Sequence, residues 1–213
     1  MSVQNIFSPK ATRILRVLLI NPNREWSILN LSEEADTAYG HTYRVLKTLL
    51  KLGLCRKTEA NRVRVAGPRE LLSRWAAYHD FNLLNDAEAY HSMEGDLDSL
   101  IGKLPSIESG KLRYALTLHV GASLIAPYVR PASLHIYVEG GGGSLVKRLG
   151  LRPAELGGNV YLVHPYDEGV YYGVQRVRGV YVVSNVQLYV DLYNYPARGR
   201  EAAEHLRKEA IGF

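Results

Sequence analysis

The chain has 213 residues, a length that suits one large domain or two small ones. Apolar residues make up 46% and charged residues 22% of the sequence, close to ordinary globular domains, so a disordered, collagen-like or coiled-coil chain is excluded. The formal net charge of +5 favours a nucleic acid or another anionic surface as partner. A single cysteine, Cys55, excludes an internal disulfide and a cysteine-rich zinc site.

No apolar run approaches the roughly 18 residues that a membrane span requires. The first ten residues lack the basic stretch and apolar run of a secretory signal. We therefore expect a cytoplasmic protein with no membrane partner.

The charge is distributed unevenly along the chain. Residues 1–80 carry 13 Lys and Arg against 7 Asp and Glu, a net charge of +6. Residues 81–110 carry one Lys against six acids, a net charge of −5, and residues 111–213 carry 12 bases against 8 acids, a net charge of +4. This pattern predicts a basic N-terminal module, an acidic connector and a milder C-terminal domain, which we place at residues 1–67, 68–110 and 111–213.

Two short helices are predicted first. Ser8-Pro9 is typical of an N-cap followed by proline at the first helical position, and Asn21-Pro22-Asn23 would end that helix. Ser27 is the expected N-cap of the second helix, over about 28–35. A tight turn at Asp36-Thr37 follows, with Thr37 expected as the next N-cap.

The third helix is predicted over 38–52 and ends at Gly53, a favourable residue just beyond a helix. Its expected buried positions are spaced i, i+3, i+4 and i+7, namely Thr42, Val45, Leu46 and Leu49. The side chains near the start of the helix on the other face would then point outward.

A hairpin is expected next, with arms at 54–58 and 62–65 and a turn in which Asn61 adopts a left-handed conformation. Val63 and Val65 alternate with Arg62 and Arg64, so one face would be apolar and the other cationic. Cys55 is expected to be a small buried hydrophobic residue rather than a redox switch.

Residues 8–66 resemble the winged helix-turn-helix superfamily in the order and spacing of these elements. The resemblance implies that the third helix enters the major groove of double-stranded DNA and that the hairpin, the wing, touches the backbone. Arg44 would contact a guanine edge and Lys47 a phosphate. Gly40 would permit close approach of the backbone. The complete set of expected DNA contacts is Tyr39, Gly40, His41, Tyr43, Arg44, Lys47, Arg56, Lys57, Arg62 and Arg64.

The rest of the chain predicts an α+β protein in which the winged helix precedes a mixed α/β domain with a small sheet flanked by helices. We expect helices over 68–78, 86–104, 114–128, 144–149, 184–193 and 201–210, and strands over 133–138, 160–164, 170–174 and 180–183.

Few residues of the C-terminal part suggest catalysis. The glycine run 140–143 lacks the residues of a phosphate-binding loop, and the seven histidines show no zinc-like spacing. Asp191 lies among apolar residues and could form a buried ion pair with Arg198 or Arg200. Asp167 is expected in a solvated turn. We assign no catalytic residue, metal or cofactor, and expect no enzyme.

Two stretches near the C-terminus, 182–192 and 196–206, resemble the signature of AbiEi-type antitoxins, which are transcriptional regulators of type IV toxin–antitoxin pairs. Residues 71–75 and 114–129 are also similar to members of that family. The resemblance implies a repressor of its own operon and, by genetic linkage, a nucleotidyltransferase-like toxin.

The leading hypothesis is a DNA-binding repressor. One alternative is a metal-dependent enzyme acting on nucleic acid or nucleotides through Asp167 and Asp191. Another is a winged-helix module for protein interaction. A homodimer is expected of many winged-helix regulators, although no heptad repeat marks a dimer helix here.

Overall fold

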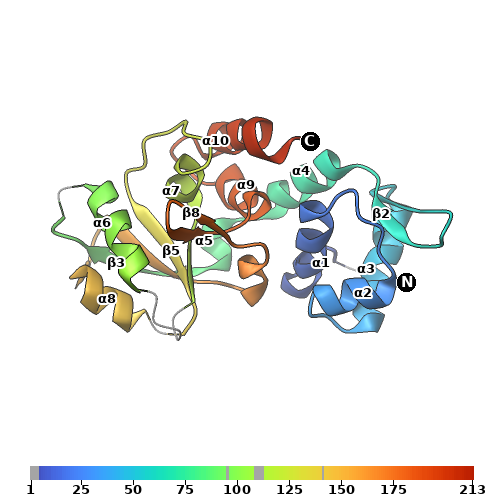
Figure 1. Ribbon diagram of the computed structural model, residues 1–213, viewed down its shortest axis with the longest axis horizontal. Helices are drawn as coiled ribbons and strands as arrows, with labels where there is room; N and C mark the ends of the chain where they lie inside the picture. The colour runs from blue at the N-terminus through green and yellow to red at the C-terminus, as the bar shows by residue number, and fades with distance from the viewer. Residues whose placement is uncertain (1–4, 95, 108–112, 141) are drawn as a thin grey trace. The chain divides into compact units, whose positions relative to one another are not determined.

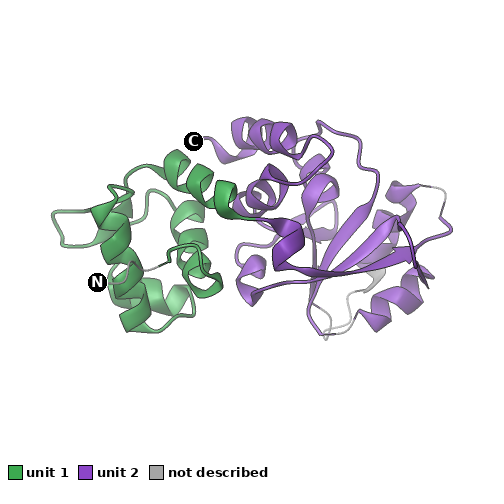
Figure 2. Ribbon diagram, turned by 180° about the vertical axis from the view of Figure 1, so that it is seen from behind, with its two compact units in different colours: residues 1–79, 213 green, residues 80–212 purple. Residues whose placement is uncertain are grey.

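The computed structural model describes residues 5–94, 96–107, 113–140 and 142–213. These residues fold into two compact units (Figure 2): residues 1–79 with Phe213 form unit 1, and residues 80–212 form unit 2. The segment 68–110 contributes its first helix to unit 1, and its later described elements belong to unit 2.

The described residues of unit 1 form four helices and one hairpin (Figure 1). Its elements in chain order are α1 (Pro9–Ile20), α2 (Ile28–Glu34), α3 (Tyr39–Lys51), β1 (Cys55–Lys57), β2 (Val63–Val65) and α4 (Pro68–Tyr78).

Helix α1 forms the centre of the unit 1 core. Ile14, Leu15 and Leu18 are completely buried along it, and burial of each such side chain contributes roughly 1.5–3 kcal/mol. Helix α1 begins at Pro9 after Ser8, as predicted, although the Ser8 side chain makes no capping hydrogen bond. The Ser27 hydroxyl caps α2 by accepting from the amide of Asn30 at 3.1 Å.

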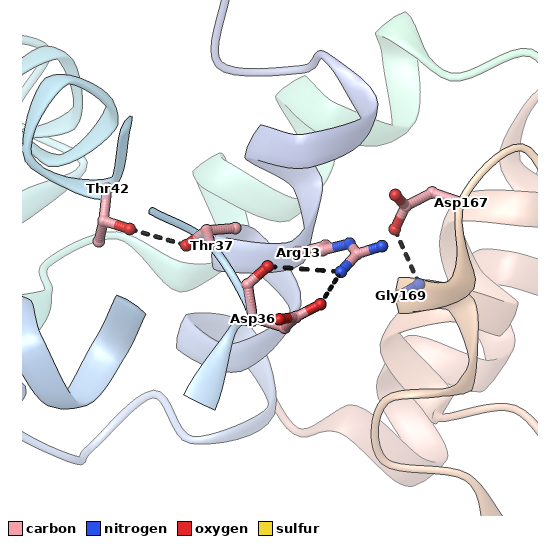
Figure 3. A network of polar contacts seen from close by, with 6 residues as sticks. All are labelled: Arg13, Asp36, Thr37, Thr42, Asp167 and Gly169. Carbon is pink, nitrogen blue, oxygen red and sulfur yellow. Dashed lines mark hydrogen bonds and ion pairs between the residues drawn. The ribbon is translucent and has the colours of Figure 1, made fainter. Parts of the chain in front are cut away.

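The turn between α2 and α3 is held by side chains (Figure 3). Asp36 has a left-handed backbone with φ of 47°, and its carboxylate accepts from Arg13 Nη1 of α1 at 2.5 Å. Thr37 was predicted to cap α3, but the N-cap is Ala38, and the Thr37 hydroxyl instead bonds the Thr42 hydroxyl at 2.7 Å. These contacts tie the turn to α1 and to the first turn of α3.

The hairpin is joined to a third short strand segment. Trp26 pairs with Val63 through two backbone hydrogen bonds of 2.8 Å, which adds the segment before α2 to the β1–β2 pair. Asn61 is left-handed with φ of 54°, as predicted for the turn. Trp26 is 1% exposed and pairs with the hairpin near its turn, where Val63 lies opposite Lys57.

Unit 2 contains a seven-stranded mixed sheet in the order β6-β3-β7-β5-β4-β9-β8. The pairs β5–β7 and β4–β9 are parallel and the other pairs are antiparallel. The strands are β3 (Asp86–His91), β4 (Tyr114–Leu116), β5 (Leu134–Val138), β6 (Arg152–Pro153), β7 (Val160–His164), β8 (Gln175–Val177) and β9 (Val180–Val182).

The helical elements of unit 2 are α5 (Phe81–Leu84), α6 (Leu97–Lys103), η1 (Leu104–Ile107), α7 (Leu118–Ser123), α8 (Gly143–Leu149), η2 (Glu168–Tyr171), α9 (Asn185–Tyr193), α10 (Gly199–Leu206) and η3 (Arg207–Ile211). Helices α7, α9 and α10 pack on one another. A Cβ at Gly121 of α7 would lie 2.7 Å from Leu188 Cδ2 of α9, so glycine allows this close approach.

Three predictions for unit 2 are wrong. Residues 86–91 form strand β3 rather than the start of a helix over 86–104, because five residues of β3 pair along β7. The predicted helix 114–128 is divided into β4 and α7, and Leu118, the first residue of α7, is left-handed with φ of 52°. The predicted strand 170–174 begins as the 3₁₀ helix η2, whose first turn is capped by Asp167. Pairing partners distant in the sequence override local patterns here.

Candidate nucleic-acid interface

Helix α3 presents one face to the core and the opposite face to solvent. Thr42, Val45, Leu46 and Leu49 are buried, each no more than 1% exposed. This pattern confirms the predicted burial of α3. The predicted contact residues Tyr39, Gly40, Tyr43, Arg44 and Lys47 are all exposed.

Two large aromatic side chains stand out from this helix. Tyr39 is 54% exposed and Tyr43 is 48% exposed. A solvated phenol ring offers a flat apolar surface and one hydroxyl group, which suit contacts to thymine methyl groups and phosphate oxygens.

Gly40 and Arg44 are neighbours on the exposed face of α3. A Cβ placed at Gly40 would lie 3.6 Å from Arg44 Nη1, an ordinary van der Waals distance. The Arg44 guanidinium group therefore folds toward the start of the helix. The N-cap Ala38 has no side chain that accepts from the first amides of α3, which leaves donors there for an external anion.

His41 lies beside these residues in a more buried position. It lines a shallow pocket at the start of α3, together with Lys10 of α1, and its Nε2 is buried without a hydrogen-bond partner among the described residues. Burial, followed by the positive charges of Arg44 and Lys10, lowers the pKa of His41 below its ordinary value. His41 is thus mostly neutral at pH 7.

The hairpin separates its cations onto two faces. Arg56 of β1 is directly opposite Arg64 of β2, so both lie on one face. Arg62 pairs with Thr58 just beyond the strands and belongs to the same face by alternation. Lys57 pairs with Val63 and lies on the face turned toward α3. Val63 and Val65 are buried and Arg62 is exposed, which confirms the predicted alternation.

None of these six cations has an ion-pair partner among the residues that the structure describes: Arg44, Lys47, Arg56, Lys57, Arg62 and Arg64. The carboxylate of Glu25 contacts the hairpin by accepting from the Thr58 hydroxyl at 3.0 Å. Charges left without a partner on α3 and on the two faces of the hairpin produce a positive potential that attracts polyanions.

A pocket of about 280 Å³ lies between α3 and the hairpin. Sequence reasoning missed it, because its walls come from the segment around Trp26, from α3 and from the hairpin. Its lining brings together three of the predicted contact residues, Tyr43, Lys47 and Lys57. The β1 residue Cys55 is buried, and burial raises the pKa of its thiol to about 12, so it is an inert packing residue.

The two acids considered for catalysis, Asp191 and Asp167, each make hydrogen bonds that stabilise the fold. Asp191 is 1% exposed and accepts from the Thr117 hydroxyl at 2.6 Å, the Gln187 amide at 2.7 Å and the Tyr137 hydroxyl at 3.1 Å. One of its two predicted partners, Arg198, is exposed and bonds Glu201 at 2.5 Å.

Asp167 caps η2 by accepting from the Gly169 amide at 2.8 Å (Figure 3). Within the described parts of the chain, no group of three or more His, Cys, Asp or Glu side chains is placed to hold a metal ion. The glycine run 140–143 ends at the first residue of α8, and Gly141 lies outside the described residues.

The comparison with protein families matches residues 64–212 to the family described as transcriptional regulator, AbiEi antitoxin, type IV TA system. The chain belongs to this family. The match begins within β2 and spans α4 and unit 2, so it extends through the C-terminal signature in β9, α9 and α10. Comparisons with curated proteins and with solved structures gave no match.

Membership in the AbiEi family supports a role as a transcriptional regulator or antitoxin of a type IV toxin–antitoxin system. Among the helices of the described residues, none has the length and apolar character needed to cross a membrane.

Proposed function

We propose that this AbiEi family protein is a DNA-binding repressor and that unit 1 is a winged helix-turn-helix domain. In this proposal α3 is the recognition helix and the β1–β2 hairpin is the wing. The observation that carries the proposal is the group of six cations on α3 and the hairpin that have no acidic partner among the described residues. Phosphate groups of double-stranded DNA would supply the missing partners.

The exposed start of α3 supports major-groove entry. Arg44 can donate two hydrogen bonds to the O6 and N7 atoms of guanine, whereas Lys47, one turn further, reaches a phosphate. Tyr39 and Tyr43 project from the same exposed surface. The uncapped amides at the start of α3 favour a phosphate at that end.

We propose that different parts of the chain carry different roles. Residues 1–67 would bind the operator, residues 68–110 would connect, and residues 111–213 would carry the antitoxin function. The chain would repress its own operon, bind a two-fold symmetric site as a homodimer, and be linked genetically to a nucleotidyltransferase-like toxin. Such a repressor would act in the cytoplasm.

Selection of binding sites from a random pool of duplexes tests this proposal. The full chain should enrich one motif, and the region upstream of its own gene should contain that motif. Recovery of an unenriched pool would contradict sequence-specific repression. Co-purification with a protein partner in the absence of any DNA binding would favour the protein-interaction alternative.

A further inference from the structure

The pocket between α3 and the hairpin has an apolar floor and a cationic rim. Trp26, Leu46 and Val63 form the floor and are each at most 5% exposed. Ile28 and Leu50 are the half-buried walls. The exposed rim consists of Tyr43, Lys47, Lys57 and Asn61.

This combination selects for a small amphipathic anion. An apolar floor favours a ring or branched hydrocarbon, and two ammonium groups favour a carboxylate at the entrance. The indole Nε1 of Trp26 is also buried without a hydrogen-bond partner among the described atoms. The volume of about 280 Å³ accommodates on the order of nine non-hydrogen atoms, because a water molecule occupies about 30 Å³ of liquid.

We infer that this pocket binds a small aromatic carboxylate and that the bound carboxylate competes with DNA for Lys47 and Lys57. The competition rests on the proposed DNA-binding function, because it requires both lysines to contact phosphate in the operator complex. A carboxylate paired with both lysines occupies two of the six cations available to DNA and lowers the net positive charge of this surface by one. The pocket would then act as an effector site that releases the repressor.

Isothermal titration calorimetry of the full chain with benzoate tests the pocket directly. Benzoate has nine non-hydrogen atoms, and we expect saturable binding with a dissociation constant on the order of 1 mM, as suits so small a ligand. Benzamide has the same shape without the charge and should bind roughly three- to tenfold more weakly. Equal binding of benzoate and benzamide would overturn the assignment of an anion.

Two charge variants of adjacent residues locate the binding site. Lys57→Gln removes a cation that lines the pocket and should weaken benzoate binding by roughly threefold. Arg56→Gln removes the same charge from the other face of the hairpin and should leave benzoate binding unchanged. Equal losses in both variants would mean that benzoate responds only to overall charge, which contradicts the pocket.

Fluorescence gives a second measurement that depends on Trp26. The chain contains two tryptophans, so Trp75→Phe leaves Trp26 as the only indole. Benzoate should change the emission of this variant with the dissociation constant found by calorimetry. If that variant fails to fold, the calorimetric comparison of Lys57→Gln with Arg56→Gln still decides the question.

Release of DNA is tested by measuring the affinity for the selected duplex in benzoate and in acetate at the same ionic strength. Benzoate should lower the affinity for the selected duplex, and acetate should not. A chain that binds DNA but takes up no benzoate at several times its expected dissociation constant overturns this inference and leaves the proposed function intact. A chain that binds benzoate through Lys57 but no DNA supports the pocket and contradicts the proposed function.

Discussion

Arg56 on β1 lies directly opposite Arg64 on β2, so two guanidinium groups share one face of the hairpin. Like charges in opposed positions destabilise an antiparallel pair, and cross-strand pairs have energies of about 0.2–1 kcal/mol. Neither arginine has an acidic partner among the described residues. A phosphate backbone lying across the hairpin would relieve this repulsion, as the proposed DNA contact of the wing requires.

Arg56→Gln should raise the free energy of unfolding by up to about 0.5 kcal/mol, because it removes the repulsion across the strands. The same change should weaken DNA binding. It should also reduce the slope of log affinity against log salt by about one, which corresponds to the loss of one phosphate contact. Chemical denaturation and binding at several salt concentrations measure the two effects.

Arg69 on α4 provides the matched control for that experiment. It is exposed and lies outside the proposed contact surface, so Arg69→Gln removes the same charge without touching the hairpin. The salt dependence of DNA binding by Arg69→Gln should equal that of the natural chain. An equal loss in both variants would show that net charge, rather than the hairpin, determines DNA affinity.

Gly40 yields a prediction in which stability and binding change in opposite directions. A Cβ at this position meets only Arg44 Nη1 at 3.6 Å, so Gly40→Ala fits the free protein. Alanine should stabilise the helix by about 0.5–1 kcal/mol. If the backbone approaches DNA closely here, the added methyl group should weaken binding about tenfold. A variant that is both more stable and equally tight in DNA binding would contradict close approach at Gly40.

The aromatic cluster formed by His135, Tyr161 and Tyr195 in unit 2 predicts that the protein loses stability at acid pH. His135 stacks on Tyr161 with ring centroids 4.6 Å apart, and its Nε2 lies 3.1 Å from the Tyr195 hydroxyl. Burial, followed by the charge of His119, lowers the pKa of His135 from 6.5 to about 4. The unfolded chain therefore takes up a proton at a higher pH than the folded chain does.

The contribution of His135 to stability is complete above pH 6.5 and decreases as the pH falls toward 4, by up to about 3 kcal/mol. His119, whose pKa is also lowered by burial, acts in the same direction. His135→Phe keeps a ring against Tyr161 and should remove most of this dependence. Denaturant unfolding of both proteins between pH 4 and 7 measures this dependence. Equal changes of the unfolding free energy with pH in the two proteins would contradict this role of His135.

Substitution of Asp191 should destabilise the fold, and metal ions should not change its stability. Its carboxylate accepts from three neutral donors in the interior, on Thr117, Tyr137 and Gln187. Asp191→Asn replaces one acceptor oxygen by a donor group and should cost about 1–3 kcal/mol of unfolding free energy. Addition of Mg²⁺ or Mn²⁺ should leave the melting temperature of the natural chain unchanged. Stabilisation by either ion that disappears in the variant would instead favour the metal-dependent enzyme.

Local signals made unit 1 predictable from the sequence. The burial of Thr42, Val45, Leu46 and Leu49 follows from spacing within one helix, and the left-handed Asn61 follows from turn chemistry. The sequence did not predict the pairing of Trp26 with Val63, because the two residues are 37 positions apart. The pocket beside α3 depends on that pairing and was missed with it.

Unit 2 was harder to predict because its strands depend on distant partners. Strand β3 has exposed side chains and few strong strand formers, and only its pairing with β6 and β7 makes it a strand. The donors around Asp191 show the same dependence. Gln187 lies four residues away, whereas Tyr137 and Thr117 lie 54 and 74 residues away.

The most direct test of the account is the salt dependence of binding to the duplex upstream of the gene, measured by fluorescence anisotropy for the natural chain, Lys47→Ala and Arg44→Ala. DNA recognition by α3 predicts a linear fall of log affinity with log salt for the natural chain and a slope smaller by about one for Lys47→Ala. It also predicts a loss of sequence preference of about 1–3 kcal/mol in Arg44→Ala. Absence of salt-dependent binding by the natural chain, or identical behaviour of all three proteins, would contradict DNA recognition by α3.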